Sequence, residues 1–116
     1  MKLLRASITT AALALLCAGS AMAQQSAQQP AQDASARALH TRQLAANCAA
    51  CHGTDGRAVA GSPVVGLAGM PAATLTNAMR EFKDGKRQAT VMHQIAKGLS
   101  DEQVKTLADY FAAQKP

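Results

Sequence analysis

Residues 48–52 of this 116-residue chain form the pattern Cys-x-x-Cys-His, which constrains the possible folds more than any other feature. On a helical turn, side chains at i and i+3 face the same way, so Cys48 and Cys51 can both add to the vinyl groups of one porphyrin. His52 follows directly and can offer a ring nitrogen to the iron. The pattern therefore predicts the covalent attachment of one c-type haem, whose iron shuttles one electron.

Three simpler interpretations of the two cysteines compete with haem: a thioredoxin-like redox pair, half of a zinc site, and a short disulfide. A thioredoxin-like pair needs strands around it, and no alternating strand pattern is present. A structural zinc site needs four ligands, and no second cysteine pair follows. His52 has no task in the redox-pair and zinc alternatives, whereas haem attachment uses all three residues. A Cys48–Cys51 disulfide is the main remaining alternative for an exported chain.

The N-terminal segment has the features of a secretory signal peptide. A basic start precedes a short apolar run, which ends at a small-x-small cleavage site. The apolar run is too short to span a membrane, so we predict a signal peptide over 1–23, no transmembrane segment and a periplasmic protein. Cys17 would be removed with this peptide. A stretch rich in Gln and Ala predicts a flexible leader over 24–34, and the folded domain is expected over 35–116.

The composition indicates a core that is too small to be stable without help. The chain has two Phe, one Tyr and no Trp, so a domain of this size buries little apolar surface from its own side chains. A covalently held haem would supply a large apolar plate for helices to pack against. The net charge of +5 is modest, and no aromatic residues alternate with basic ones, so a nucleic-acid partner is not expected.

Apolar residues recur at helical spacing, and the predicted fold class is all-α. The first helix is expected to start with Ser35 as its N-cap and to run into the Cys-x-x-Cys-His motif. A second helix starts at Pro71, a short helical turn covers 91–97, and Ser100 with Gln103 forms a capping box for the last helix. The faces expected to carry the core contain Leu39 and Leu44, then Leu75, Ala78, Met79 and Phe82, then Val104, Leu107, Ala108 and Phe111.

The order of these features resembles the class I c-type cytochromes of the c4/c553 branch. The segments that carry the resemblance are CAACHGTDG (48–56), LAGM (67–70), FKDGKR (82–87) and VMHQIAKGLSDEQ (91–103). Within the branch, the chain looks most like the cytochrome subunit of flavocytochrome c sulfide dehydrogenase. The resemblance implies a small class I cytochrome c fold over 35–116, with helices packed around one covalently bound haem.

The resemblance also implies an iron ligated by one histidine and one methionine. His52 takes one axial position, and Met70, Met79 and Met92 are the candidates for the other. Met79 lies on an apolar helix face, where core packing is the simpler role. Met70 follows His52 closely and has a short path around the haem edge. Met92 has the spacing before Ser100 that the branch assigns to the ligand, so it is our predicted second ligand.

Pro63 is the expected partner of the axial histidine. A ligating histidine usually donates its other ring N–H to a backbone carbonyl, and in class I cytochromes a proline after the glycine loop has that role. The predicted haem-binding residues are therefore Cys48, Cys51, His52, Pro63 and Met92, of which His52 and Met92 bind the iron. Thr41 stands where many relatives have a glycine at the crossing of the first and last helices.

The resemblance implies a protein that transfers single electrons and performs no bond chemistry of its own. Its expected partner is a sulfide-oxidising flavoprotein subunit, with a role as a free soluble carrier between periplasmic redox enzymes as the alternative. A haem-based sensor or peroxidase with five-coordinate iron is a third possibility. Four basic residues around Met92 are expected either to steer an acidic partner or to be a solvated surface: Lys83, Lys86, Arg87 and Lys97.

Overall fold

The computed structural model describes residues 29–116. The predicted signal peptide and the first residues of the predicted leader lie outside the described residues. The chain divides into two units, Met1–Ala38 and Leu39–Pro116, and the predicted site lies entirely in the second. Residues 29–116 contain helices and no strand, which confirms the all-α prediction. No helix within this range is both long and apolar enough to cross a membrane.

The described part of the first unit, residues 29–38, is helical. Ser35 therefore lies inside a helix, and the expectation that it is an N-cap is wrong. Its hydroxyl donates a hydrogen bond to the carbonyl of Ala31 at 3.0 Å, as a serine within a helix can. The surrounding residues are mainly Ala and Gln, which favour helix strongly enough to continue it through a serine.

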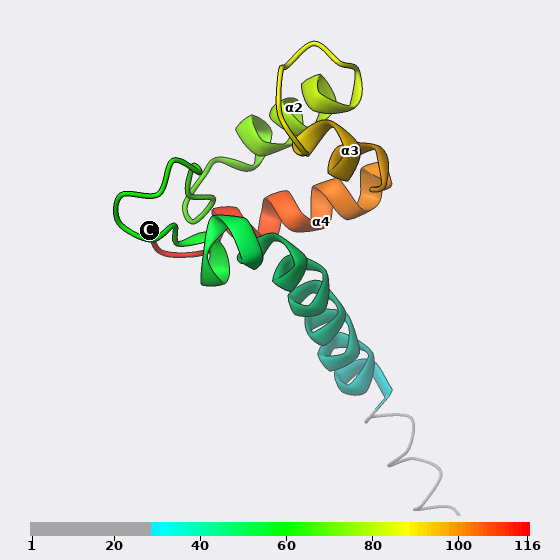
Figure 1. Ribbon diagram of the computed structural model, residues 1–116. Helices are drawn as coiled ribbons and strands as arrows, with labels where there is room; N and C mark the ends of the chain where they lie inside the picture. The colour runs from blue at the N-terminus through cyan, green and yellow to red at the C-terminus, as the bar shows by residue number, and fades with distance from the viewer. Residues whose placement is uncertain (1–28) are drawn as a thin grey trace, which may run out of the picture. The chain divides into compact units, whose positions relative to one another are not determined.

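The second unit consists of five helical elements in chain order (Figure 1). Residues 39–52 form the helix that ends in the Cys-x-x-Cys-His motif, here called the motif helix. The short 3-10 helix η1 (Thr54–Gly56) follows, and then come α2 (Ala72–Lys83), α3 (Met92–Lys97) and α4 (Asp101–Ala112). Helix α2 packs against both α3 and α4.

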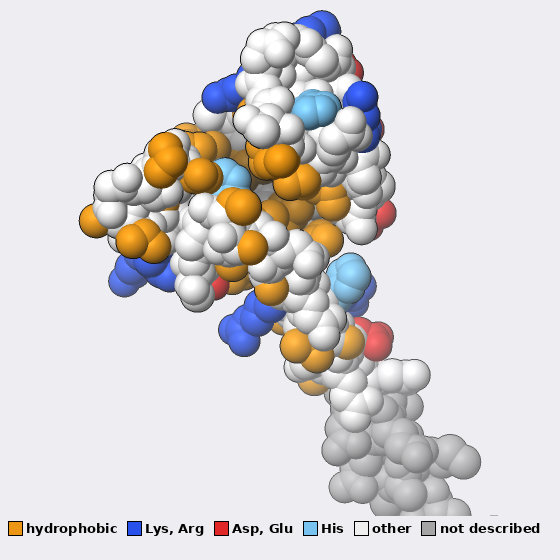
Figure 2. All heavy atoms as spheres, viewed as in Figure 1, with side chains coloured by type: hydrophobic (Ala, Val, Ile, Leu, Met, Phe, Trp, Pro, Cys, Tyr) orange, Lys and Arg blue, Asp and Glu red, His pale blue; other side chains and the backbone are white. Residues whose placement is uncertain are grey.

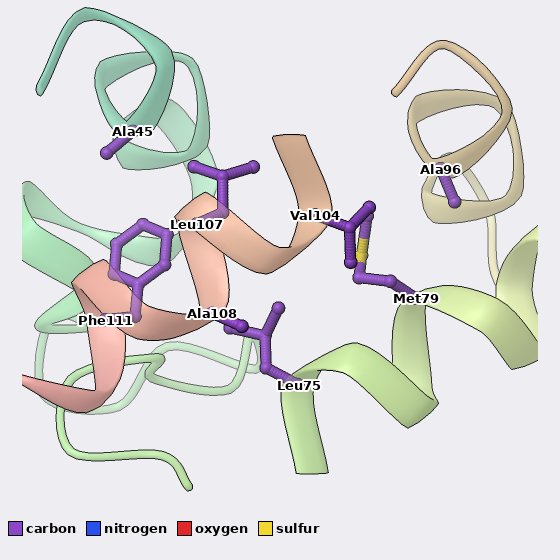
Figure 3. Close-up of a cluster of buried hydrophobic side chains, with 8 residues drawn as sticks. All are labelled: Ala45, Leu75, Met79, Ala96, Val104, Leu107, Ala108 and Phe111. Carbon is purple, nitrogen blue, oxygen red and sulfur yellow. The ribbon is translucent and has the colours of Figure 1, made fainter. Parts of the chain in front are cut away.

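The core of the second unit forms where α4 meets the other helices. Figure 3 shows Phe111 and Leu107 of α4 facing Ala45 of the motif helix, and Val104 facing Met79 of α2. The buried apolar residues form one cluster: Ala45, Leu75, Met79, Ala96, Val104, Leu107, Ala108 and Phe111. The predicted apolar face of α4 is buried over its whole length. On the motif helix, Leu44 packs against this cluster but Leu39 is 58% exposed, so only part of the predicted face contributes.

The start of α4 is fixed by the predicted capping box. The Ser100 hydroxyl accepts a hydrogen bond from the backbone N–H of Gln103, and the Gln103 side chain accepts one from the backbone N–H of Ser100. This pair satisfies two donors that a helix start leaves without partners. Lys83, at the end of α2, donates to the carbonyl of Leu99 at 3.0 Å and to Asp101 at 3.1 Å. The end of α2 is thereby tied to the junction between α3 and α4.

Candidate functional site: the Cys-x-x-Cys-His turn and the segments around it

Both motif cysteines lie on the last turns of the motif helix. Cys48 is half-buried against the core, Cys51 is exposed, and both are free thiols. Burial raises the pKa of the Cys48 thiol above its ordinary value, because a thiolate loses solvation there. The helix stops at once after the motif, where Gly53 has φ 81°. A Cβ at Gly53 would lie 1.8 Å from the carbonyl oxygen of Arg57, so only glycine fits this sharp exit.

His52 is the one buried polar or charged residue within 29–116, at 8% exposure. Its Nδ1 lies 2.7 Å from the carbonyl oxygen of Val65, a hydrogen bond in which the ring N–H donates. The bond holds the imidazole in one orientation and leaves Nε2 as the nitrogen with a lone pair. This arrangement, with one ring nitrogen bonded to a carbonyl and the other available, is typical of histidines that bind metals.

The carbonyl that receives this bond belongs to Val65 and not to Pro63, so the prediction for Pro63 is corrected by two residues. The path of the loop explains the shift. The carbonyl of Gly56 accepts hydrogen bonds from the N–H groups of Leu67, at 2.7 Å, and Ala68, at 3.1 Å. These bonds bring the chain back to η1 at Leu67, and Val65, two residues before that return, reaches the His52 ring.

The three methionines have different surroundings. Met79 is buried in the core cluster, as predicted. Met70 and Met92 are both partly buried and pack against that cluster. Met92 is the first residue of α3 and lies near His52. The Met92 thioether and the His52 imidazole are therefore close in space although they are far apart in the sequence.

Apolar side chains remain exposed on the two segments that carry the Val65 carbonyl and Met92. They are Val59 and Val65 in the loop after η1, and Val91 and Ile95 beside and within α3; we call these four residues the apolar rim. Figure 2 shows hydrophobic side chains gathered on the visible face of the second unit. Two thiols one helical turn apart, an oriented imidazole and a nearby thioether are the groups that a covalent haem requires.

The basic residues expected to surround the site are largely paired with carboxylates. Lys83 pairs with Asp101 at 3.1 Å and Lys86 with Asp84 at 3.3 Å. Arg87 lies 3.9 Å from Glu81, and its guanidinium stacks 4.9 Å from the centre of the Phe82 ring. Lys97 makes no ion pair with any residue of the described part. The local positive potential is therefore weaker than the sequence suggested.

A link that the sequence analysis missed joins η1 to α4. The Tyr110 hydroxyl donates to Asp55 Oδ1 at 2.6 Å, and Arg57 donates to Asp55 Oδ2 at 3.1 Å. The hydrogen bond from Tyr110, followed by that from Arg57, lowers the pKa of Asp55, and the bond to Asp55 raises the pKa of Tyr110. Arg57 also donates to the carbonyl of Lys115 at 3.0 Å, so its guanidinium bonds to both η1 and the C-terminal residues.

Other kinds of site find less support within residues 29–116. No three His, Cys, Asp or Glu side chains cluster there as a metal site of the zinc type would need. A cavity of about 410 Å³ lies between the motif helix, η1 and the end of α4, and neither motif cysteine nor His52 lines it. The chemistry is therefore concentrated at the Cys-x-x-Cys-His turn.

Comparisons with known proteins agree with this arrangement. A family model described as Cytochrome c matches residues 38–115. The thiosulfate dehydrogenase electron acceptor of Thiomonas intermedia is 45% identical over 75 residues, which cover 62% of this chain and 33% of that protein. Cytochrome c-554(548) of Halomonas halodenitrificans is 39% identical over 72 residues, or 59% of this chain and 84% of that protein.

A third relative is named as part of a larger enzyme. The cytochrome subunit of sulfide dehydrogenase of Chlorobaculum tepidum is 38% identical over 68 residues, which cover 59% of this chain and 60% of that subunit. The aligned region thus spans a third of the first relative, most of the second and three fifths of the third.

Proposed function

This chain belongs to the cytochrome c family, and from that premise we propose that it is a mono-haem electron-transfer protein whose iron is bound by His52 and Met92. The observation that carries the proposal is the His52 ring, buried and held by Val65 with Nε2 available. When bound, the haem supplies a one-electron couple between ferric and ferrous iron. The domain boundary proposed from the sequence, residue 35, lies close to residue 38, where the family match begins.

In this proposal each residue at the site has a distinct task. Cys48 and Cys51 would hold the porphyrin through two thioether bonds and so prevent its dissociation. The Val65 carbonyl orients His52 and makes its ring more electron-rich. Met92, at the start of α3, would provide the second protein ligand to the iron, and a thioether ligand would raise the potential. A sixth ligand also distinguishes an electron carrier from a sensor or peroxidase, which needs an open position.

We further propose that the electron donor is an enzyme that oxidises an inorganic sulfur compound, and that a sulfide-oxidising flavoprotein subunit is the partner. Two of the relatives above have names that refer to sulfide or thiosulfate dehydrogenases. The apolar rim supports a stable interface, because exposed apolar groups at a protein surface gain free energy when a partner covers them. The pairing of Lys83, Lys86 and Arg87 with carboxylates argues against binding that depends mainly on charge.

The second candidate is a free carrier between redox enzymes. The observation in its favour is the alignment with 84% of cytochrome c-554(548). Most of that relative is therefore a single domain like the one in this chain. For either candidate we propose a periplasmic location after cleavage behind Ala23. N-terminal sequencing of the mature protein should then begin at Gln24.

Stopped-flow reduction of the holoprotein at low and high ionic strength tests the choice between the candidates. An apolar interface should give a rate that changes little with salt, together with a complex that survives gel filtration. Val59→Ser and Ile95→Ser should weaken that complex. The control is Lys97→Gln, which removes one surface charge and no residue of the apolar rim, and it should leave the complex intact. A rate that falls steeply with salt, with no stable complex, would favour the free carrier.

A further inference from the structure

The Asp55–Tyr110 hydrogen bond is a long-range contact that the proposed function does not yet use. It joins residues 55 positions apart, and its length of 2.6 Å is typical of a hydrogen bond from a hydroxyl to a charged carboxylate. Tyr110 keeps its ring edge against Phe111, with centroids 5.2 Å apart at 80°. The hydroxyl therefore extends from a ring that the end of α4 already holds in place.

Asp55 is itself in an unusual backbone conformation. Its φ is 53°, the one positive value among the non-glycine residues of the described range. Aspartate tolerates this region better than most residues, but the conformation still has to be held by its surroundings. The two bonds to its carboxylate, from Tyr110 and Arg57, provide that restraint.

The residue after Asp55 determines where the following loop returns. The carbonyl of Gly56 accepts hydrogen bonds from the N–H groups of Leu67 and Ala68. A Cβ at Gly56 would lie 2.9 Å from Leu67 Cβ and 2.9 Å from Phe111 Cδ1, so the loop and α4 both lie close against this residue. Gly69 then donates its N–H to the carbonyl of Phe111 at 2.9 Å. The loop that carries Val65 is thus fixed between η1 and α4 at both of these points.

We propose that Asp55 and Tyr110 are positioning residues for the axial histidine: they hold η1 so that the Val65 carbonyl stays on Nδ1 of His52. This inference rests on the proposed role of His52 as an iron ligand. The strength of the bond from Nδ1 governs how electron-rich the imidazole is, and hence how well it stabilises ferric iron. A hydroxyl on α4 would in this way influence the potential without touching the haem.

The test uses the haem-loaded protein and two readouts that a merely structural role would not change. The first is the rate at which the Nδ1 proton of His52 exchanges with solvent, measured by NMR in the ferrous state. The second is the reduction potential. Tyr110→Phe removes the hydroxyl and keeps the ring. We expect the Nδ1 proton of His52 to exchange about five- to tenfold faster, which is the factor that corresponds to the net contribution of one hydrogen bond. The potential should become more positive, because a weaker bond leaves the imidazole a poorer donor.

Three further variants keep the test decisive. Asp55→Gly removes the carboxylate without backbone strain and should reproduce Tyr110→Phe, which also covers the case that Tyr110→Phe does not fold. Asp55→Asn keeps an oxygen that can accept from Tyr110 and should restore exchange to within about twofold of the parent. Lys105→Gln breaks the exposed pair between Lys105 and Asp109, 2.6 Å apart on the same helix, and should change neither readout.

The outcomes distinguish this inference from the proposed function. If Tyr110→Phe and Asp55→Gly lower the melting temperature but leave exchange and potential unchanged, the pair is only structural and the inference is wrong. If the parent protein itself shows no Nδ1 proton of a haem-bound His52, the ligand assignment has failed before any variant is compared. Faster exchange and a more positive potential in both variants, with recovery in Asp55→Asn, would establish the positioning role.

Discussion

The core around α4 and the apolar rim near His52 contain similar side chains at opposite levels of burial. Leu107, Ala108 and Phe111 are at most 3% exposed, and they pack on side chains of α2 and the motif helix. Val65 of the rim is 60% exposed and Val91 is 52%. The comparison teaches that this small domain buries the apolar face of α4 with its own residues. The segments that carry the Val65 carbonyl and Met92 instead leave Val65 and Val91 exposed, so this part of the domain has apolar surface that its own residues do not cover.

The largest effect in this comparison should come from removing the attachment of haem. In Cys48→Ser/Cys51→Ser no haem would be held covalently beside His52, and its apolar surface would be lost to the domain. We expect loss of most of the free energy of unfolding, which for domains is on the order of 5–15 kcal/mol. Thermal melts measure the loss. Mass spectrometry after acid–acetone extraction should show one retained haem in the parent and none in the variant.

Ala50→Ser is the matched control for this change, because it alters an exposed position of the same motif and keeps both sulfurs. It should retain haem and stability. A parent protein that emerges from extraction without haem, holding only a Cys48–Cys51 disulfide, would remove the basis of the proposed function.

Two methionines allow the two regions to be separated directly. Met79→Ala leaves a cavity in the core and should cost about 2–5 kcal/mol of stability, while the methionine-to-iron charge-transfer band of the ferric protein persists. Met92→Ala should abolish that band and lower the potential. Absorption spectra and denaturant titrations of both variants give the comparison. If the band survived in Met92→Ala and vanished in Met70→Ala, the assignment of the ligand would pass to Met70.

A smaller effect is expected from two serines, one in each region. Ser100→Ala removes half of the capping box of α4 and should cost about 0.5–2 kcal/mol without a change in potential. Ser62→Ala removes the acceptor for the N–H of Val64, in an exposed part of the loop near the rim, and should cost less. Thermal melts measure the loss of stability in each variant, and potentiometry measures any change in the reduction potential. An equal loss in both variants would mean that the loop is as cooperative with the fold as α4 is.

The smallest effect concerns pH. The pKa of Asp55 is lowered in the folded state, so its contribution is present above the unfolded value of about 3.9 and is lost as the pH falls through the folded pKa. The pKa of Tyr110 is raised, so its contribution is present below about 10 and is lost as the pH rises through the folded pKa. Melts across pH should show both declines, and Tyr110→Phe should remove the alkaline one. An unchanged alkaline decline in that variant would assign it to another group.

Much of the helical framework could be predicted because it depends on local patterns. The periodic apolar residues of α4 and the spacing of Ser100 and Gln103 determine a buried face and a cap through neighbours within one or two turns. Met79 was recognisable as a core residue for the same reason. Ser35 was misplaced because a serine before a helical pattern resembles a cap even where Ala and Gln continue the helix upstream.

The partner of His52 could not be placed to the residue, because it depends on tertiary contacts. Whether Pro63 or Val65 reaches the ring is decided by where Gly56 receives Leu67 and Ala68, which no local pattern encodes. The bond between Asp55 and Tyr110 was missed for a related reason. Each residue has an ordinary local role, and only the packing of α4 beside η1 brings them together.

The position of Met92 at the first residue of α3 has a consequence for how readily the sixth ligand is released. Toward the C-terminus it is anchored by Ala96, which is fully buried. Toward the N-terminus, residues 88–91 connect it to Arg87, whose N–H bonds to Glu81 of α2, and most of this connection is exposed. Segments of this kind open at a lower free energy than the whole domain. Local opening of this short connection would withdraw the sulfur while α2 and α4 stay folded, so ligand-exchange kinetics would measure the free energy of that local opening.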